Sequence, residues 1–251
     1  MEKKIVFITG GSKGIGLELA KEFVRNDFYI INFSRSKIPL THLNCKHIYC
    51  DLAKSDAVKI FGSELNSVID KFGNSVEKWI LINNAGVLEP ILPVVKLQNT
   101  QAISEHFAIN LVNPIKFSVD FMVALSQQIS NKMIINVGSG AANQPIEGWA
   151  LYGSSKVALH YFTATTALEQ SREKYPVKMI LFDPGKTDTN MQAIIRSTEK
   201  ANFPLVEHFQ QAFDLGTLND PTRLAKNLVL KIINDTLKQG ELVSHKDLLK
   251  F

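Results

Sequence analysis

The sequence predicts an α/β protein in which a doubly wound parallel sheet of about seven strands carries helices on both faces. Strand-like and helix-like runs alternate along all 251 residues, without an internal repeat or a low-complexity linker. Several strand-like runs, such as residues 5–8 and 79–82, are continuously apolar, which is typical of strands covered on both faces. A chain of this length can bury one substantial core, so we expect a single domain over residues 1–251.

The first strand-like run, residues 4–8, leads into a glycine-rich stretch over residues 9–16, and apolar residues at helical spacing follow it. Glycines at a strand-to-helix junction let the backbone approach a pyrophosphate closely, while the helix N-terminal N–H groups hold the anion. An ordinary turn also uses glycine, but this placement favours dinucleotide binding and a Rossmann-type sheet. The expected cofactor contacts here are Gly10, Ser12, Lys13, Gly14, Ile15 and Gly16.

The second strand, residues 28–33, ends at Ser34 and Arg35. In a dinucleotide fold this tip faces the adenosine ribose, where a carboxylate would bond a free 2′-hydroxyl and repel a 2′-phosphate. The tip carries no acid; Ser34 and Arg35, with Lys13 and Lys37 nearby, offer charge-assisted hydrogen bonds to a phosphate. The sequence therefore favours NADP(H) as the cofactor, and a solvent-exposed loop arginine is the alternative.

A third short strand, residues 46–50, is followed by a helix that ends at residue 72, and a fourth strand covers residues 79–82. Small residues and amides at the carboxyl ends of parallel strands line the ligand crevice of a doubly wound sheet, although they also make ordinary turns. The residues of this kind after the third and fourth strands are expected cofactor contacts: Asp51, Leu52, Asn84, Ala85 and Gly86.

Two helical stretches are expected next, over residues 101–110 and 114–130. We expect a break around Asn113 and Pro114, because proline disfavours a helical conformation in the residue before it. A fifth strand over residues 133–137 then brings Ser139 to the same edge of the sheet as the earlier strand ends.

Tyr152 and Lys156 lie four residues apart in a helix-permissive run that extends to residue 173. That spacing places both side chains on one helical face, where a nearby ammonium favours the phenolate and would lower the tyrosine pKa toward the working pH. Such a pair suits general acid or base catalysis, although an exposed Tyr with a Lys one turn on is also common on surfaces. His160, one turn beyond Lys156, is expected to be a packing or interface residue.

A sixth strand covers residues 177–182. The segment 187–216 contains helical stretches, a proline and mixed polar residues, which suits a substrate loop or lid better than a core element. A last helix over residues 221–237 and a short closing strand over residues 241–243 complete the expected order.

The composition disfavours several other classes of protein. The net charge of +4 comes from scattered Lys and Arg residues, so nucleic-acid binding is not expected. Cys45 and Cys50 form neither a disulfide framework nor a metal-ligand spacing, and they fit a reduced, cytoplasmic protein without a metal. We expect neither a membrane span nor secretion, because no uninterrupted apolar run approaches about 18 residues and the N-terminus shows no signal-peptide cleavage site.

Taken together, these motifs resemble the short-chain dehydrogenase/reductase family over nearly the whole chain. The family's TGxxxGxG pattern covers residues 9–16, its NNAG pattern residues 83–86, and its YxxxK pattern residues 152–156. The resemblance places the family's adenine-side acid at Asp51 and implies a PG…T cofactor motif, with expected contacts at Pro184, Gly185, Thr187 and Thr189. It also places Ser34 where NAD-preferring members carry Asp, and Arg35 follows it as in NADP-preferring members.

The resemblance implies an NADP-dependent oxidoreductase that transfers a hydride to a small-molecule carbonyl substrate, with Tyr152 as the proton donor. Lys156 would tune the phenol and hold the nicotinamide ribose, so both residues of the pair are expected to touch the cofactor. Ser139 would position the carbonyl oxygen, and Asn110 would hold a water that links Lys156 to solvent. Asn110, Ser139, Tyr152 and Lys156 are thus the expected catalytic residues.

Within the family, residues 188–192 and 240–244 are similar to the sepiapterin reductase group, which includes bacterial benzil reductases. Ser244 stands where sepiapterin reductases anchor the pterin with an Asp, so one carbonyl of a 1,2-diketone is the expected substrate. A pterin, or another substrate of short-chain alcohol dehydrogenases, is the alternative. A non-catalytic NADP-binding sensor is the competing class, disfavoured because Tyr152 and Ser139 are both present.

The helix that follows Tyr152 carries apolar residues on more than one face, so it needs a partner besides the sheet. Family members commonly pair this helix between subunits, and we expect a homodimer or homotetramer. The residues concerned are Val157, Ala158, Tyr161, Phe162, Ala164, Thr165 and Leu168.

Overall fold

The structure is a computed structural model, and it describes residues 3–249. Met1, Glu2, Lys250 and Phe251 lie outside the described residues. The expected domain limits and the expected lack of a signal peptide both involve these chain ends, so they stay predictions.

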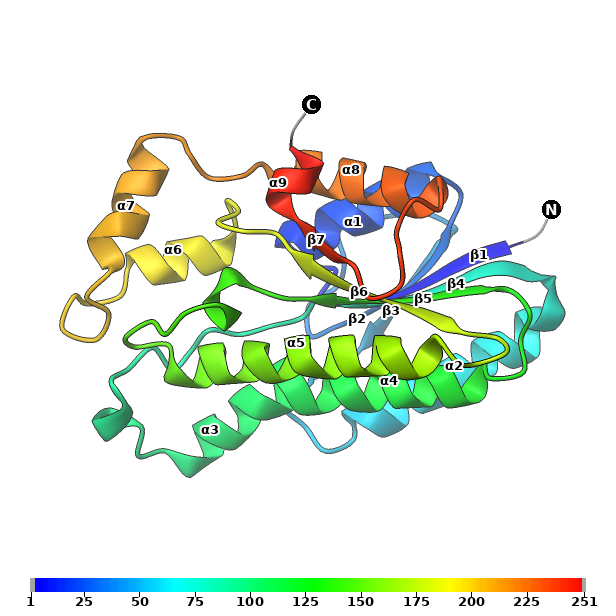
Figure 1. Cartoon of the computed structure of the whole chain (residues 1–251), viewed down its shortest axis with the longest axis horizontal. Helices are drawn as coiled ribbons and strands as arrows, with labels where there is room; N and C mark the ends of the chain where they lie inside the picture. The colour runs from blue at the N-terminus through cyan, green and yellow to red at the C-terminus, as the bar shows by residue number, and fades with distance from the viewer. Residues whose placement is uncertain (1–2, 250–251) are drawn as a thin grey trace.

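Within residues 3–249, seven parallel strands form one sheet in the order β3-β2-β1-β4-β5-β6-β7 (Figure 1). The chain starts at β1, winds outward through β2 and β3, and returns to β4 on the other side of β1. The carboxyl ends of β1 and β4 therefore border a crevice, as in other doubly wound sheets, and the predicted fold class is confirmed. The strands are β1 (Lys3–Thr9), β2 (Tyr29–Ser34), β3 (Cys45–Tyr49), β4 (Val76–Asn83), β5 (Asn131–Val137), β6 (Val177–Asp183) and β7 (Leu242–Ser244).

The continuously apolar strands are explained by a core on each face of the sheet. Successive strand side chains point to opposite faces. In β1, Val6 and Ile8 belong to one buried cluster, and Ile5 and Phe7 belong to the other. Neither face is left to solvent, so these strands have no polar alternation.

Helices cover both faces of this sheet (Figure 1). One layer contains α1 (Gly14–Arg25), α8 (Pro221–Ile233) and α9 (His245–Leu248), and α1 packs directly against α8. The other layer contains α2 (Ala57–Phe72), α3 (Thr100–Phe107), α4 (Asn113–Ala124) and α5 (Ala150–Gln170). Short helical turns connect these elements at η1 (Gly73–Ser75), η2 (Val94–Lys96), η3 (Ala108–Val112) and η4 (Gly140–Ala142).

The expected break at Asn113 and Pro114 is wrong. Helix α3 continues through η3, a π-helical turn, into α4, so the backbone is helical from Thr100 to Ala124. A proline ring clashes with the carbonyl four residues earlier in a regular α-helix, and a π turn widens the backbone at that point. The helix also stops at Ala124 instead of residue 130. Beyond its end, the carbonyls of Leu125 and Gln128 accept hydrogen bonds from the Lys132 ammonium in place of helical N–H groups.

Two further element ends differ from the sequence-based expectation. Helix α8 ends at Ile233 instead of residue 237, since Asp235 adopts a left-handed conformation with φ of 50°. Helix α9 was not expected at all. Its first turn is held by a capping box, in which the side chains of Ser244 and Asp247 each bond the other residue's backbone N–H.

One helix of the described residues, Thr100–Ala124, is long and apolar enough to cross a membrane by length and composition alone. Its Phe117 and Phe121 side chains are buried in the core between this helix, α2 and the sheet. A core helix that packs on a sheet can meet the same criterion of length and composition, so we describe Thr100–Ala124 as part of the helical layer.

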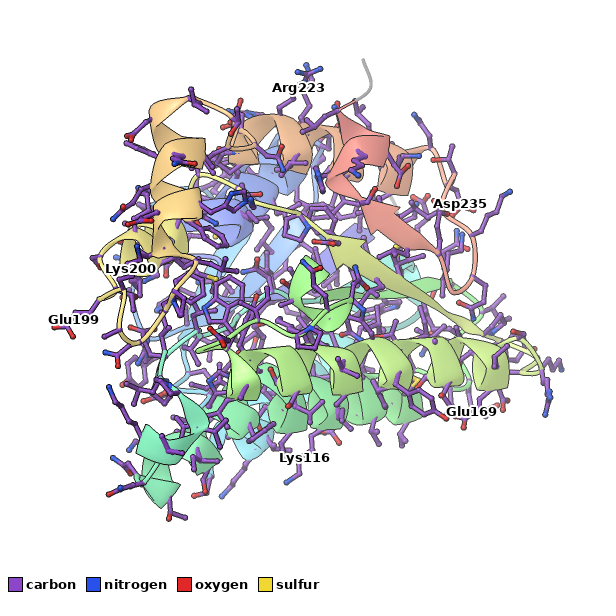
Figure 2. The ribbon with its side chains drawn as sticks, turned by 60° about the vertical axis from the view of Figure 1, so that its left-hand side comes forward. Lys116, Glu169, Glu199, Lys200, Arg223 and Asp235 are labelled. Carbon is purple, nitrogen blue, oxygen red and sulfur yellow. The ribbon has the colours of Figure 1, made fainter. Side chains whose placement is uncertain are left out.

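Helices α6 (Asn190–Arg196) and α7 (Val206–Asp214) lie beyond the carboxyl ends of the strands, at the left of Figure 1. Glu199 and Lys200 mark the loop between them in Figure 2. Both helices fall in the segment 187–216, whose expected helical stretches are confirmed. Its role as a lid stays a prediction.

Candidate active site

A cavity of about 270 Å³ lies at the carboxyl ends of the strands and gathers most of the residues selected from sequence. All of the expected cofactor contacts line it, and so do Ser139, Tyr152 and Lys156. Asn110 is the exception, because its side chain is buried behind the cavity wall. The expected cofactor contacts on the wall are Gly10, Ser12, Lys13, Gly14, Ile15, Gly16, Ser34, Arg35, Asp51, Leu52, Asn84, Ala85, Gly86, Tyr152, Lys156, Pro184, Gly185, Thr187 and Thr189.

The glycine-rich turn between β1 and α1 is compact for steric reasons. Gly10 has φ of 70°, which disfavours other residues, and a Cβ atom on Gly16 would lie 2.4 Å from the Gly10 carbonyl oxygen. Asn84 fixes this turn to β4, since its Nδ2 donates to the carbonyls of Thr9 and Gly10 at 2.9 and 3.2 Å. The Thr9 hydroxyl in turn accepts the backbone N–H groups of Asn84 and Ala85. The bare backbone that a pyrophosphate needs is therefore held in place.

The tip of β2 is organised by Asn32, which sequence reasoning missed. Its Oδ1 accepts the Gly11 N–H at 2.8 Å, and its Nδ2 donates to the Ser34 hydroxyl at 2.8 Å. The Ser34 hydroxyl donates to the Ser36 carbonyl, while the Arg35 side chain is exposed at the cavity rim. A short polar residue inside an otherwise apolar strand was the available signal.

Tyr152 and Lys156 project from the first turns of α5, and both are buried. The Lys156 ammonium lies 5.6 Å from the centre of the Tyr152 ring and donates to the Val137 carbonyl at 2.8 Å. Val137 ends β5, and Ser139 follows it, so the strand end and the helix start bring all three side chains to one place. The predicted proximity of the pair is therefore confirmed.

The expected lowering of the tyrosine pKa is wrong for this structure. Burial raises the pKa of Tyr152, a hydrogen bond with the Ser139 side chain lowers it, and the negative charge of Asp183 raises it. Burial also lowers the pKa of Lys156 to about 8, which the Asp183 carboxylate partly opposes. Desolvation dominates because both groups leave water, and the Lys156 ammonium is directed at a carbonyl instead of the phenol. The phenol therefore holds its proton in this state.

Two titratable residues near this group were not selected as catalytic. Asp183 ends β6, lines the cavity and accepts the Gly185 N–H at 3.0 Å. His160 is half-buried under Ser139, and its Nε2 accepts the Ser139 N–H at 3.3 Å. The expectation that His160 packs within the structure is met, and it also fixes the backbone of Ser139. The position of Asp183 directly before the PG motif could have indicated from the sequence that this acid lies at the cavity.

Asn110 acts on the cavity through Val87, which lines the cavity wall. Its Oδ1 accepts the Val87 N–H at 2.9 Å, and its Nδ2 donates to the Val87 carbonyl at 2.7 Å. The same Nδ2 lies 2.9 Å from Nε2 of His106, whose Nδ1 lies 2.9 Å from the Glu89 carbonyl. Burial lowers the pKa of His106, so this buried imidazole is neutral at physiological pH. In the sequence, only the position of His106 one helical turn before Asn110 could have suggested that it contacts Asn110.

The loop after β6 closes the cavity on the side of α6. The Thr187 hydroxyl donates to the Pro184 carbonyl at 2.8 Å, which folds the loop back on itself. Thr189 is the N-cap residue of α6 and lies next to Gly14, so the PG segment meets the glycine-rich turn. Lys186 reaches outward and contacts Nε2 of His208 on α7.

An apolar cluster lies beside Tyr152. The Trp149 ring stacks on Phe203 with centroids 5.0 Å apart and meets the Tyr152 ring edge-on at 5.6 Å. Met191 and Ile195 of α6 also pack into this cluster. Of this cluster, Tyr152 and Met191 line the cavity, while Trp149, Phe203 and Ile195 pack behind them. The segment 187–216 therefore supplies part of the apolar support for this end of the cavity.

Among residues 3–249, no group of three or more His, Cys, Asp or Glu side chains is arranged to hold a metal ion. The arrangement described above can bind a dinucleotide along the glycine-rich turn and present one hydroxyl, one phenol and one ammonium to a small molecule. That combination suits proton-coupled transfer to or from an oxygen atom.

A family model described as short chain dehydrogenase matches residues 4–200. A benzil reductase ((S)-benzoin forming) of Bacillus subtilis is 33% identical over 248 residues, which cover 98% of this chain and 100% of that protein. A benzil reductase of Saccharomyces cerevisiae is 30% identical over 97% of this chain and 96% of that protein. A sepiapterin reductase of Rattus norvegicus is 27% identical over 69% of this chain and 65% of that protein.

The crystal structure of a short chain dehydrogenase/reductase from Saccharomyces cerevisiae superimposes with a TM-score of 0.82. The two sequences are 25% identical, and the match covers 99% of both chains. The family model spans well over half of the described residues, and the two benzil reductases match almost from end to end. This chain therefore belongs to the short chain dehydrogenase family, whose members are oxidoreductases that use nicotinamide cofactors.

Proposed function

We propose that this protein is an NADPH-dependent carbonyl reductase that acts on one carbonyl of a 1,2-diketone. The observation that carries the proposal is the meeting of Ser139, Tyr152 and Lys156 at one end of a cavity whose other end is the glycine-rich turn. The cradle fits a dinucleotide, since Gly10, Gly14 and Gly16 line the cavity at the N-terminus of α1, where backbone N–H groups can hold the phosphates. The benzil reductases named above support the choice of substrate.

Bound NADPH would supply a hydride to the carbonyl carbon. The Ser139 hydroxyl holds the carbonyl oxygen, and this hydrogen bond strengthens as negative charge develops there. Tyr152 then transfers its phenolic proton to the same oxygen, which gives an alcohol, NADP⁺ and a tyrosinate. A phenol whose pKa is raised by burial keeps its proton until that moment, which suits the direction of reduction.

Lys156 stabilises the tyrosinate after the proton has left, because its ammonium is 5.6 Å from the ring centre. Its hydrogen bond to Val137 uses one of three N–H donors, which leaves donors for the ribose hydroxyls. Both N–H groups of the Asn110 amide are engaged, by the Val87 carbonyl and by His106, while Oδ1 accepts one hydrogen bond, from Val87. A water held by Asn110 would therefore donate to the second lone pair of Oδ1.

Three observations support the finer choices. Arg35 and Lys13 line the end of the cavity at the β2 tip, which favours the 2′-phosphate of NADPH. Tyr152 and Met191 of the apolar cluster line the cavity, which favours an aromatic or aliphatic diketone. Ser244 is occupied by Asp247, to which its hydroxyl donates at 2.6 Å, so it offers little to a pterin.

NADPH oxidation by the purified protein would test this function against a panel of benzil, smaller 1,2-diketones, sepiapterin and quinones. We expect kcat/KM for the best diketone to exceed that for sepiapterin by at least about tenfold. A protein that binds NADPH tightly and reduces none of the panel would be a cofactor sensor, and the proposal would be wrong.

We also propose that the protein self-associates through α4 and α5. The side chains of Val157, Tyr161 and Leu168 are 50, 76 and 69% exposed on α5, and Val123 is 69% exposed on neighbouring α4. Lys116 and Glu169 lie on the same two helices (Figure 2). A dimer would cover this surface. Sedimentation should show a dimer or tetramer at micromolar concentration, and Tyr161→Arg should shift it to monomer.

The segment 187–216 is proposed to act as a lid. Lys96 of η2 donates to Asn202 at 2.9 Å, and Lys186 contacts His208, so two side-chain contacts link it to the loops around the cavity.

Both cysteines are free thiols, which is consistent with the proposed cytoplasmic location.

A further inference from the structure

Gln192 has a buried side chain that makes no hydrogen bond within the described residues. It belongs to α6, and the residue is 6% exposed. Its Oε1 is fully enclosed without a partner. It lines the same cavity as Ser139 and Tyr152. Native proteins leave few buried polar groups unsatisfied, so an amide in this position indicates a partner that the chain itself does not supply.

The position of Gln192 on α6 determines where its side-chain amide lies, because the amide makes no hydrogen bond that would hold it there. The Gln192 N–H donates to the Thr189 carbonyl at 3.0 Å in the first turn of α6. Ile195, three residues later on the same face, is 2% exposed and belongs to the apolar cluster that contains Trp149 and Tyr152. A leucine of similar size would suit these surroundings without leaving a polar group unpaired. Without a partner, the buried amide therefore lowers the stability of the protein.

We propose that the Gln192 amide binds a second oxygen of the substrate, adjacent to the carbonyl that Tyr152 protonates. This inference rests on the proposed function, and it makes Gln192 the residue that distinguishes a 1,2-diketone from a simple ketone. A carbonyl oxygen only accepts hydrogen bonds, so it pairs with the NH₂ end of the amide and not with Oε1. A half-turn of the amide exchanges the two ends, which places the NH₂ donors at the unpaired position, where one of them donates to the second carbonyl.

The nicotinamide carboxamide is the other ligand chemistry that this amide suits. The substrate is favoured because α6 packs into the apolar cluster through Met191, Ile194 and Ile195, and that cluster surrounds Tyr152. The cofactor motif of the same loop is separate from it, since Thr189 lies against Gly14 of the glycine-rich turn.

Gln192→Leu tests the inference with two probes of the same carbon skeleton. Benzil has two adjacent carbonyls, and deoxybenzoin has one. We expect the ratio of kcat/KM for benzil to kcat/KM for deoxybenzoin to fall at least fivefold in the variant. The unliganded variant should melt at the same or a higher temperature than the parent, because an unpaired amide has been removed. Gln211→Leu, on the exposed face of α7, is the matched control and should leave the ratio unchanged.

An unchanged ratio in Gln192→Leu would overturn the inference while the proposed function stands. Equal losses with both ketones, together with weaker NADPH binding in a fluorescence titration, would assign the amide to the nicotinamide instead. A parent protein that does not reduce benzil or any other 1,2-diketone would overturn the proposed function itself, and that result needs no variant.

Discussion

Lysine side chains are buried at both edges of the sheet, and their surroundings differ. Lys156 lies at the carboxyl edge and is 4% exposed, while Lys78 and Lys132 lie near the amino ends of β4 and β5 and are 6 and 4% exposed. Burial lowers the pKa of all three. Burial and a lowered pKa are therefore shared by the proposed active site and by the opposite edge.

At the amino edge, the ammonium groups complete the ends of helices. Lys78 donates to the Ile232 carbonyl at 2.9 Å, in the last turn of α8. Lys132 donates to the carbonyls of Leu125 and Gln128, just beyond α4. The last carbonyls of a helix lack intrahelical donors and carry the negative end of its dipole, so a cation there is stabilising. These two lysines have a structural role.

At the carboxyl edge, Lys156 makes a single hydrogen bond, to Val137, and lines a cavity together with Ser139 and Tyr152. Lys78 also makes a single hydrogen bond, and Lys78 and Lys132 line a cavity at the amino edge. The difference is that the cavity at the carboxyl edge brings a hydroxyl, a phenol and an ammonium together beside the glycine-rich turn. The comparison teaches that this combination of groups marks the site, whereas burial, a shifted pKa or an unused donor alone does not.

The largest expected effect comes from Tyr152→Phe, which removes only the proton donor. We expect turnover to fall about 10²-fold or more while NADPH affinity is kept, because the ring still packs against Trp149. Steady-state kinetics and a fluorescence titration with NADPH would measure both. Tyr161→Phe, on the exposed face of the same helix, is the control and should behave as the parent. Near-parental turnover of Tyr152→Phe would show that Tyr152 is not the proton donor.

Lys156→Met tests how the buried Lys156 ammonium makes the stability of the protein depend on pH. The folded-state pKa of about 8 lies below the unfolded value of 10.5, so the unfolded chain binds more protons between these values. Parental stability should therefore rise with pH across that window, by up to about 1.4 kcal/mol per pH unit, and the cost of the buried ammonium is fully present below pH 8. The variant should lose this rise, along with turnover and NADPH affinity. Urea denaturation at pH 7, 8, 9 and 10 would measure the free energy of unfolding of both proteins. If the Lys156 ammonium were not desolvated, the parent and the variant would show the same dependence of stability on pH.

Arg35→Ala tests the open end of the same cavity. The parent should prefer NADPH over NADH by at least about tenfold, since a charge-assisted hydrogen bond to the 2′-phosphate contributes roughly 1.5 kcal/mol or more. The variant should lose most of that preference through a higher KM for NADPH. Arg25→Ala, whose side chain pairs with Glu22 on α1, should leave it unchanged. Equal use of the two cofactors by the parent would contradict the assignment.

Lys132→Met should give the smallest effect and would test the structural edge directly. Two carbonyls after α4 lose their donor, so the free energy of unfolding should fall by about 1 kcal/mol. Turnover of the folded protein should match the parent, because Lys132 is at the opposite edge from the cavity. A large loss of turnover with normal thermal stability would show that the two edges are functionally coupled.

Much of the fold was predictable because it depends on local patterns. Apolar runs such as residues 79–82 specify buried strands. Glycine is required at position 10, where φ is 70°, and at position 16, where a Cβ atom would lie 2.4 Å from the Gly10 carbonyl oxygen. The error at Pro114 has the same origin. A proline signals a helix boundary locally, but a π turn in the preceding residues accommodates its ring.

The sequence by itself determined the strand-to-helix order, the glycine-rich turn and the four-residue spacing of Tyr152 and Lys156, since each is set by neighbours along the chain. The tertiary structure decided the rest. It directed the Lys156 ammonium to Val137, raised the pKa of Tyr152 by burial, locked Asn110 onto Val87 and left Gln192 unpaired in the cavity. These properties depend on which distant side chains and carbonyls exclude water around a group, and no spacing within the chain encodes that.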